Sequence, residues 1–231
     1  MGGKSKIFAL KRRIIGGTLA GLLLVFGGGC LALWLGSAFV LPAVLGIVTW
    51  LLVVIFTLYF LRDPEPNVPQ APNLVVAPAH GLVDCIEETT ELEVLNGPCR
   101  RISIFLSVLD VHVQNAPIAG KILCVKHRPG RFLSALKAES AQYNESALIG
   151  IESHEVTGER LALRQIAGAI ARRVDSWVNA GDTVSRGQRL GLIHYGSRCD
   201  LYLPLSYPIL VRLGDKVVGG ETVVAAHAVE Q

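Results

Sequence analysis

The feature that most constrains this sequence is a run of 48 residues, Ile14 to Leu61, that contains no Asp, Glu, Lys, Arg or His. A helix needs about 20 residues to cross the hydrocarbon core of a membrane, which is about 30 Å thick. The run is therefore too long for one crossing and has the length of two. Because backbone polar groups in lipid must be hydrogen-bonded internally, it predicts two transmembrane helices joined by a tight turn, near residues 14–35 and 39–60.

The flanking charges predict the orientation of this hairpin. Five basic residues precede the run: Lys4, Lys6, Lys11, Arg12 and Arg13. The predicted turn near Gly36, Ser37 and Pro42 carries none, so the positive-inside rule puts the N-terminus in the cytoplasm. We expect residues 1–61 to anchor the chain in the cell (inner) membrane, with the following domain on the cytoplasmic side. A re-entrant segment at the glycines of residues 27–29 is the alternative.

The chain after Leu61 has the polar content of a soluble domain, although the whole chain is 51% hydrophobic and only 18% charged. Three prolines within residues 62–69 predict an extended linker over residues 62–76. Residues 77–231 are long enough for one compact domain. This distribution excludes a wholly soluble protein, a disordered chain and a polytopic transporter. The net charge of +3 gives no reason to expect a nucleic-acid partner.

Short strands bounded by Gly and Pro dominate the domain, at residues 82–86, 102–106, 121–125 and 201–203. Helical periodicity is confined to residues 134–144 and 164–172. Residues 181–190 and 214–223 share the pattern G-D-x-V-x-x-G-x-x-apolar, and residues 78–83 resemble residues 117–122 as P-x-x-G-x-[VI]. The glycines permit tight turns. We predict a mainly β (α+β) protein: a duplicated, barrel-sandwich-like domain preceded by the two-helix transmembrane hairpin.

Taken singly, few residues point to chemistry. The five cysteines include no C-x-x-C pair, so they predict free thiols and no metal site. His112 follows a predicted buried strand, and Gly196–Ser197 lies between two apolar segments. A core histidine and an ordinary turn are the default interpretations of these two features.

Together, however, the motifs resemble a known family, the short-form, membrane-anchored phosphatidylserine decarboxylases, which depend on a pyruvoyl group. The order and spacing of the motifs carry the resemblance. The matching segments are F-L-R-D-P at 60–64, A-P-A-H-G at 77–81, D-V-H at 110–112, N-A-P-I-A-G-K at 115–121, P-G-R-F-L at 129–133, R-Q-I-A-G at 164–168 and Y-G-S-R at 195–198.

The resemblance implies a zymogen that undergoes autocatalytic cleavage between Gly196 and Ser197. The Ser197 hydroxyl would attack the Gly196 carbonyl to form an ester, and elimination followed by hydrolysis would leave a covalent pyruvoyl group derived from Ser197. His112 matches the family's catalytic base. The products would be a large subunit of residues 1–196 and a small subunit of residues 197–231.

The implied reaction converts phosphatidylserine to phosphatidylethanolamine and CO2 in phospholipid biosynthesis. The substrate amine would form a Schiff base with the pyruvoyl group, and His112 would supply the proton that replaces CO2. The expected partners are phosphatidylserine, membrane lipid and the two subunits themselves, whereas the choice between a monomer and a homo-oligomer stays open. Arg131 and Phe132 are the expected contacts with lipid and substrate.

One residue departs from the family pattern. His80 stands where the family has the Asp of P-A-D-G, a carboxylate that would orient the base and stabilise its charged form. A neutral His can orient the base but offers no negative charge, and Asp84 and Asp110 are the carboxylates that could compensate. The competing interpretation of the whole chain is an uncleaved, non-catalytic, membrane-tethered β-sandwich binding module.

Overall fold

The computed structural model describes residues 3–36, 40–130, 143–168, 173–194 and 197–227. The chain forms two units, Met1–Arg62 and Asp63–Gln231, and each is described by itself. Three predicted site residues, Arg131, Phe132 and Gly196, lie outside the described residues, as do residues 134–142 of the first predicted helical stretch.

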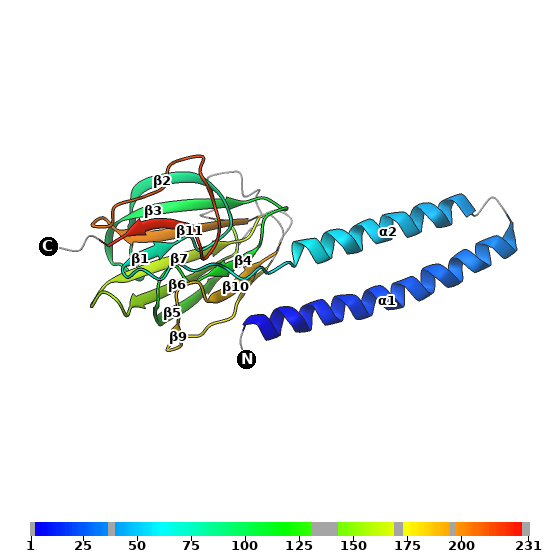
Figure 1. Cartoon of the computed structure of the whole chain (residues 1–231), viewed down its shortest axis with the longest axis horizontal. Helices are drawn as coiled ribbons and strands as arrows, with labels where there is room; N and C mark the ends of the chain where they lie inside the picture. Colours follow the sequence, from blue (N-terminus) through cyan, green and yellow to red (C-terminus); the bar gives the residue numbers. More distant parts are fainter. Residues whose placement is uncertain (1–2, 37–39, 131–142, 169–172, 195–196, 228–231) are drawn as a thin grey trace. The chain divides into compact units, whose positions relative to one another are not determined.

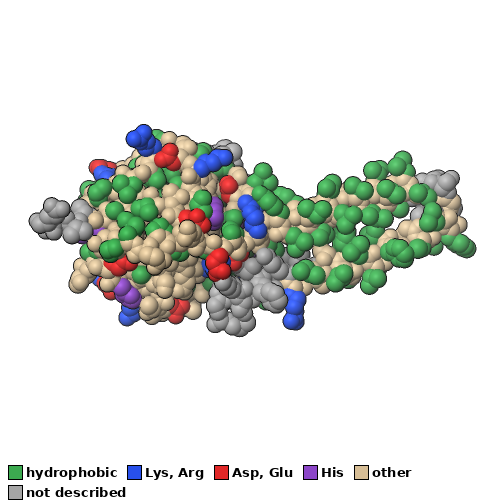
Figure 2. Space-filling model, in the orientation of Figure 1, with side chains coloured by type: hydrophobic (Ala, Val, Ile, Leu, Met, Phe, Trp, Pro, Cys, Tyr) green, Lys and Arg blue, Asp and Glu red, His purple; other side chains and the backbone are tan. Residues whose placement is uncertain are grey.

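The first unit consists of helices α1 (Gly3–Leu35) and α2 (Val40–Phe60), which pack against each other (Figure 1). Hydrophobic side chains cover both helices (Figure 2). Among the described residues, α2 is the one helix long and apolar enough to cross a membrane, because the apolar stretch of α1, Ile15–Leu31, is shorter. Both predicted helices form, α1 beginning well before residue 14, and the second crossing stays a prediction.

The second unit is mainly antiparallel β structure, as predicted. One sheet has eight strands in the order β12-β2-β3-β11-β7-β6-β5-β9, and smaller sheets have the orders β4-β10-β8 and β1-β13. The strands are β1 (Leu74–Val76), β2 (Gly81–Glu91), β3 (Gly97–Leu106), β4 (Val113–Asn115), β5 (Gly120–Arg128), β6 (Ser146–Ser153), β7 (Arg160–Ile166), β8 (Val174–Ser176), β9 (Thr183–Val184), β10 (Arg189–Ile193), β11 (Ser197–Pro204), β12 (Lys216–Val217) and β13 (Val223–Ala226).

The four predicted strands lie within β2, β3, β5 and β11 and are confirmed. The helix predicted over residues 164–172 is wrong, because residues 164–166 belong to β7. This strand pairs with β6 on one side and β11 on the other. Hydrogen bonding to two neighbours and burial of alternate side chains outweigh the weak helical periodicity of this segment.

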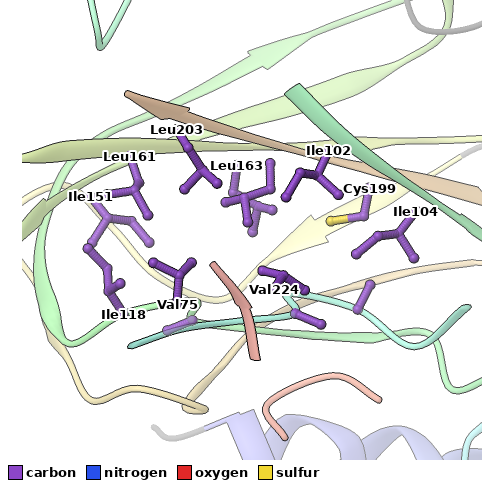
Figure 3. Close-up of a cluster of buried hydrophobic side chains, with 14 of the residues drawn as sticks. Val75, Ile102, Ile104, Ile118, Ile151, Leu161, Leu163, Cys199, Leu203 and Val224 are labelled. Carbon is purple, nitrogen blue, oxygen red and sulfur yellow. The ribbon is translucent and has the colours of Figure 1, made fainter. Parts of the chain in front are cut away.

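Alternate residues of the large sheet form the main hydrophobic core. Ile102 and Ile104 of β3 meet Leu163 of β7, Cys199 of β11 and Val224 of β13 there (Figure 3). Side chains of neighbouring residues point to the opposite face, since the side-chain period of a strand is two. A second, smaller cluster on that opposite face contains Val94, Leu148 and Tyr202.

The internal repeat is visible in the backbone. The first copy consists of residues 78–83 and 214–223, and the second copy of residues 117–122 and 181–190. In the first copy β12 pairs with β2 at Gly81, and in the second β9 pairs with β5 at Gly120. The duplication predicted from the sequence is therefore present in the fold.

Matching hydrogen bonds extend this equivalence. The amide of Gly214 donates to the Val83 carbonyl, and the amide of Gly181 donates to the Ile122 carbonyl, both at 2.8 Å. The two glycines have φ of +89° and +94°, which L side chains rarely adopt. Each copy thus uses a glycine at the equivalent turn to reach the equivalent strand, β2 in the first copy and β5 in the second.

Residues 63–72, expected to be a linker, are bound along the second unit, and we call them the strap. Arg189 Nε lies 2.7 Å from both carboxylate oxygens of Asp63. Arg186 donates to the carbonyls of Pro69 and Ala71 at 2.9 and 2.7 Å. Leu74–Val76, at the end of the expected linker, forms β1.

Candidate active site

Ser197 is the first residue of β11, where it pairs with Leu106 at the end of β3. It shares a strand face with Cys199 and Leu201 of the main core, and its side chain is completely buried. Among the described residues, none hydrogen-bonds to Ser197 Oγ. Because a buried hydroxyl without a partner is costly, its presence here calls for a functional explanation.

His112 is also completely buried and follows β3 after one turn. In this turn the Ser107 amide donates to Asp110 Oδ2 at 2.8 Å. His112 Nδ1 lies 2.9 Å from the Asp110 carbonyl oxygen. A carbonyl can only accept, so in the neutral ring Nδ1 carries the proton and Nε2 is the basic nitrogen.

Strand pairing brings His112 and Ser197 to the same end of the large sheet. The Ile193 amide, at the end of β10, donates to the His112 carbonyl at 3.1 Å. Only His194, Tyr195 and Gly196 separate Ile193 from Ser197 in the chain. Ser197 in turn pairs with Leu106, six residues before His112. A base and a hydroxyl nucleophile at one strand end are the elements of an acyl-transfer site.

A chain of buried side-chain hydrogen bonds holds the backbone of His112. Gln114 Nε2 donates to the His112 carbonyl at 2.6 Å, and Gln165 Nε2 donates to Gln114 Oε1 at 2.8 Å. Ser176 Oγ completes the chain by donating to Gln165 Oε1 at 3.1 Å. No local pattern in the sequence points to these residues, because 51 positions separate Gln114 from Gln165 and only strand pairing brings them together.

His80 lies between β1 and β2, near the same strand end, since its near neighbour Leu82 pairs with Phe105. Its ring packs against Gly219, where an added Cβ would lie 3.0 Å from both His80 Cδ2 and Asn115 Oδ1. The glycine therefore makes room for these two side chains. Asn115 itself is fixed by donating to the Gly187 carbonyl at 2.8 Å.

The two carboxylates considered as substitutes for the family Asp have other partners. Asp110 caps the turn before His112 through the Ser107 amide, and its carbonyl rather than its carboxylate holds the imidazole. Asp84 forms a hydrogen-bonded ion pair with the buried Arg198. Burial nevertheless raises the pKa of Asp84, because desolvation outweighs the attraction of Arg198.

The Asp84–Arg198 pair fixes the strand next to the expected cleavage point. Arg198 follows Ser197 directly and points to the opposite face of β11. Asp84 belongs to β2, so the pair connects β2 to β11 across β3. Before the expected cleavage point, directly after β10, His194 Nε2 lies 3.2 Å from Asp175 Oδ2. This hydrogen bond, with help from Arg173, lowers the pKa of Asp175.

The functional groups that this arrangement brings together are the Ser197 hydroxyl and the His112 imidazole. The described residues contain no group of three or more His, Cys, Asp or Glu side chains that could hold a metal ion. All five cysteines are free. Burial raises the pKa of Cys199, which faces the core two residues after Ser197, so this thiol stays protonated and unreactive.

Comparison with known proteins identifies the relatives of this chain. Residues 53–225 match the family model described as phosphatidylserine decarboxylase. A phosphatidylserine decarboxylase proenzyme of Desulfotalea psychrophila is 45% identical over 174 residues, which cover 75% of this chain and 80% of the relative. Proenzymes of the same name from Syntrophus aciditrophicus and Mycolicibacterium vanbaalenii are 41% and 48% identical, covering 73% and 72% of this chain and 78% and 72% of the relatives.

Proposed function

Because the chain belongs to the phosphatidylserine decarboxylase family and decarboxylates phosphatidylserine, we propose that Ser197 and His112 are the residues that make and operate its active site. The observation that carries this assignment is the buried Ser197 hydroxyl without a hydrogen-bond partner among the described residues. It begins a strand at the sheet end where His112 is held. Nothing in the comparisons favours the alternative of a non-catalytic binding module.

In the proposed maturation, Ser197 Oγ attacks the carbonyl carbon of Gly196 while His112 Nε2 accepts the hydroxyl proton. The peptide C–N bond breaks and an ester forms. Loss of the Ser197 α-proton then expels the Gly196 carboxylate, and water replaces the nitrogen of the resulting dehydroalanine, which leaves as ammonia. Burial of Ser197 favours attack by its hydroxyl as the first step, because burial keeps water from competing with the hydroxyl for the Gly196 carbonyl.

The small subunit would stay in place after cleavage. It begins with β11, which has β3 on one side and β7 on the other, so both edges of the new N-terminal strand are paired. The ion pair of Arg198 with Asp84 holds its first residues. We therefore propose that the 35 residues from Ser197 to Gln231 remain bound to residues 1–196 without a covalent link.

The chemistry of a pyruvoyl group fits this position. Such a group supplies a carbonyl that accepts the electrons released when CO2 leaves the substrate. Among the described residues, the Ser197 hydroxyl has no hydrogen bond that its conversion would break. We propose that His112 Nε2 returns the proton to the substrate carbon that has lost CO2, a task for which an imidazole has a suitable pKa.

We propose that both helices of the first unit cross the membrane and that the domain lies on the cytoplasmic side. The five basic residues before Ile14 support this orientation. A diacyl substrate stays in the bilayer, so anchoring the domain there raises the concentration of substrate that the site meets.

The decisive experiment compares two buried serines. Ser197 and Ser103 are both completely buried, but Ser103 lies within β3, where it pairs with Asp200. Ser197→Ala should remain one 24.8 kDa chain on a denaturing gel and produce no phosphatidylethanolamine. Ser103→Ala should separate into two chains and keep its activity. Cleavage or normal lipid product in Ser197→Ala would refute the assignment.

Histidine variants test the base in the same assay. His112→Ala should leave the precursor uncleaved, because the proposed base for the Ser197 hydroxyl would be missing. His80→Ala should slow cleavage without abolishing it, since we propose that His80 orients the site together with Asn115. Cleavage of His112→Ala at the wild-type rate would exclude His112 as the base.

A further inference from the structure

The opposite face of the large sheet contains a second polar site that the decarboxylation does not use. A pocket of about 300 Å³ lies between the end of β2 with its following turn and strands β3, β5, β7 and β11. Arg101, Arg128, Arg164 and Tyr202 line it, together with Glu93. Its volume is at the lower end of the range found for small-molecule sites.

The pocket is separate from Ser197. Tyr202 lies five residues further along β11, which corresponds to about 16 Å along the strand. The alternation of side chains also puts Tyr202 on the opposite sheet face. Tyr202 accordingly packs in the smaller cluster with Val94 and Leu148, whereas Cys199 and Leu201 pack in the main core.

Arg164 is the most unusual residue of the pocket. Only 19% of its side chain is exposed, yet its guanidinium donates no hydrogen bond to any described residue. The nearest carboxylate oxygen, Glu93 Oε1, is 4.0 Å away, and the Tyr202 ring centroid lies 5.6 Å from its central carbon. Nε of Arg164 is buried without an acceptor. A guanidinium has five donors and is always charged, so a buried one without acceptors indicates a missing anion.

Arg101 repeats this pattern on the next strand but one. Its Nη2 meets the Glu87 carboxylate at 2.8 Å, while its Nη1 is 3.7 Å from Asp200. Its Nε is buried and has no acceptor among the described residues. Arg101 and Arg164, on the same sheet face, thus each have a buried Nε donor without an acceptor among the described residues.

Four carboxylates lie at or near the pocket: Glu87 and the buried Asp200 attract Arg101, Asp200 also attracts Arg164, and Glu91 and Glu93 line the pocket. Glu93 is shared by Lys126 at 3.2 Å, Arg128 at 2.5 Å and Arg164 at 4.0 Å. The carboxylate of Glu91 is occupied by the backbone amides of residues 93, 94 and 95. Burial and the neighbouring Asp200 raise the pKa of Tyr202 to about 12, so its phenol stays neutral and can donate.

We propose that this pocket is an anion site that binds a phosphate group through Arg101, Arg164 and the rim residue Arg128. The planar fork of a guanidinium matches two oxygens of a phosphate, and charge-assisted bonds of this kind are among the strongest in proteins. The phosphate is either free inorganic phosphate or the headgroup phosphate of a glycerophospholipid. The site does not depend on the assignment of Ser197.

Calorimetric titration of the full-length protein in an uncharged detergent and a chloride buffer tests the proposal. One arm uses inorganic phosphate, and the other uses the soluble headgroup glycerophosphoserine. Wild type should bind at least one of them saturably at one site per chain, and the tighter ligand identifies the source of the phosphate. Arg164→Gln should weaken binding at least about tenfold, because it removes charge-assisted hydrogen bonds.

Arg160→Gln is the matched control, because Arg160 lies on the same strand as Arg164 but is 46% exposed and paired with Glu152. It should bind like wild type. If Arg164→Gln fails to fold, Arg128→Gln replaces it, since Arg128 is 57% exposed at the pocket rim. Absence of saturable binding to wild type, or equal affinity in the pocket variant and wild type, would overturn the proposal. Ser197→Ala should bind normally, which separates this test from the test of the catalytic residues.

Discussion

The two copies of the internal repeat share strand pairing and turns, but they exchange small and large side chains at two equivalent positions. In the first copy, His80 packs against Gly219 near the strand end that carries Ser197. The equivalent residues of the second copy are Ala119 and Arg186. There, the long side chain replaces the glycine and binds the strap through the carbonyls of Pro69 and Ala71.

This exchange shows how one structural unit serves two purposes. The turns of both copies depend on glycines with positive φ, such as Gly187 at +75° and its equivalent Gly220 at +77°. These shared glycines determine the backbone. The exchanged residues then differ in role: His80 packs against Gly219 in the first copy, whereas Arg186 binds the strap in the second.

The substitutions with the largest expected effect on stability test whether the two copies are structurally equivalent. A Cβ at Gly81 would lie 2.1 Å from the Phe105 carbonyl oxygen, and one at Gly120 would lie 2.2 Å from the Glu152 carbonyl oxygen. Each Gly→Ala substitution should lower the free energy of unfolding by about 3 kcal/mol, because backbone must move to relieve the overlap. Urea unfolding in an uncleaved Ser197→Ala background measures both variants.

Gly97→Ala is the control for this pair, since nothing lies within 4 Å of a Cβ at that position and its φ is not positive. It should change stability by less than about 0.5 kcal/mol. A large loss at only one of Gly81 and Gly120 would show that the copies differ in structure as well as in side chains.

A substitution with a smaller effect should separate the contacts of Arg186 from the proposed catalytic site. Arg186 is 7% exposed and contacts both carboxylate oxygens of Glu155 in addition to the strap. Arg186→Ala should cost about 2 kcal/mol of stability, since it removes the hydrogen bonds of a largely buried guanidinium to the strap and to Glu155. Cleavage at Ser197 should continue at the wild-type rate.

The measurement combines urea unfolding with a time course of chain cleavage on a denaturing gel. Arg160→Ala, which removes a half-exposed ion pair, should change stability by less than about 1 kcal/mol. Loss of cleavage in a folded Arg186→Ala protein would mean that the two copies do not divide their roles in this way.

The smallest expected effect on stability comes from a carboxyl group on β11. In the large sheet, β11 and β7 lie between the strands of the two copies. Burial raises the pKa of Asp200 above its usual 3.8, more than the attraction of Arg101 lowers it. Between 3.8 and the raised value, the folded protein holds a proton that the unfolded chain has released. This carboxyl therefore makes the protein less stable as pH rises through that window, and its contribution is constant above it.

Asp200→Asn removes this titration. The unfolding free energy of wild type minus that of the variant should decrease as pH rises through the window, by no more than about 1.4 kcal/mol per pH unit. Urea midpoints measured at a series of pH values give this difference. A difference that stays constant with pH would show that Asp200 has the same pKa in the folded and unfolded chain.

Much of this architecture could be predicted from the sequence because it depends on local patterns. The run without charges predicted the helices, short segments bounded by Gly and Pro predicted four strands, and two repeated motifs predicted the duplication. The helix expected over residues 164–172 was wrong because β7 has a strand partner on each side, which no local pattern reports. The bonds of Gln114 to Gln165 and of Arg198 to Asp84 were not predictable for the same reason.

The sequence alone predicted the apolar helices and the repeated turns. Through the family resemblance it also predicted Ser197, His112 and His80 as site residues. These features depend on composition and on residues near each other in the chain. Only the tertiary structure decided that Ser197 Oγ is buried without a partner among the described residues, that a backbone carbonyl holds His112, and that Arg101 and Arg164 share a pocket. Such relations depend on which distant strands pair and in what register, and pairing is selected by the packing of the whole sheet.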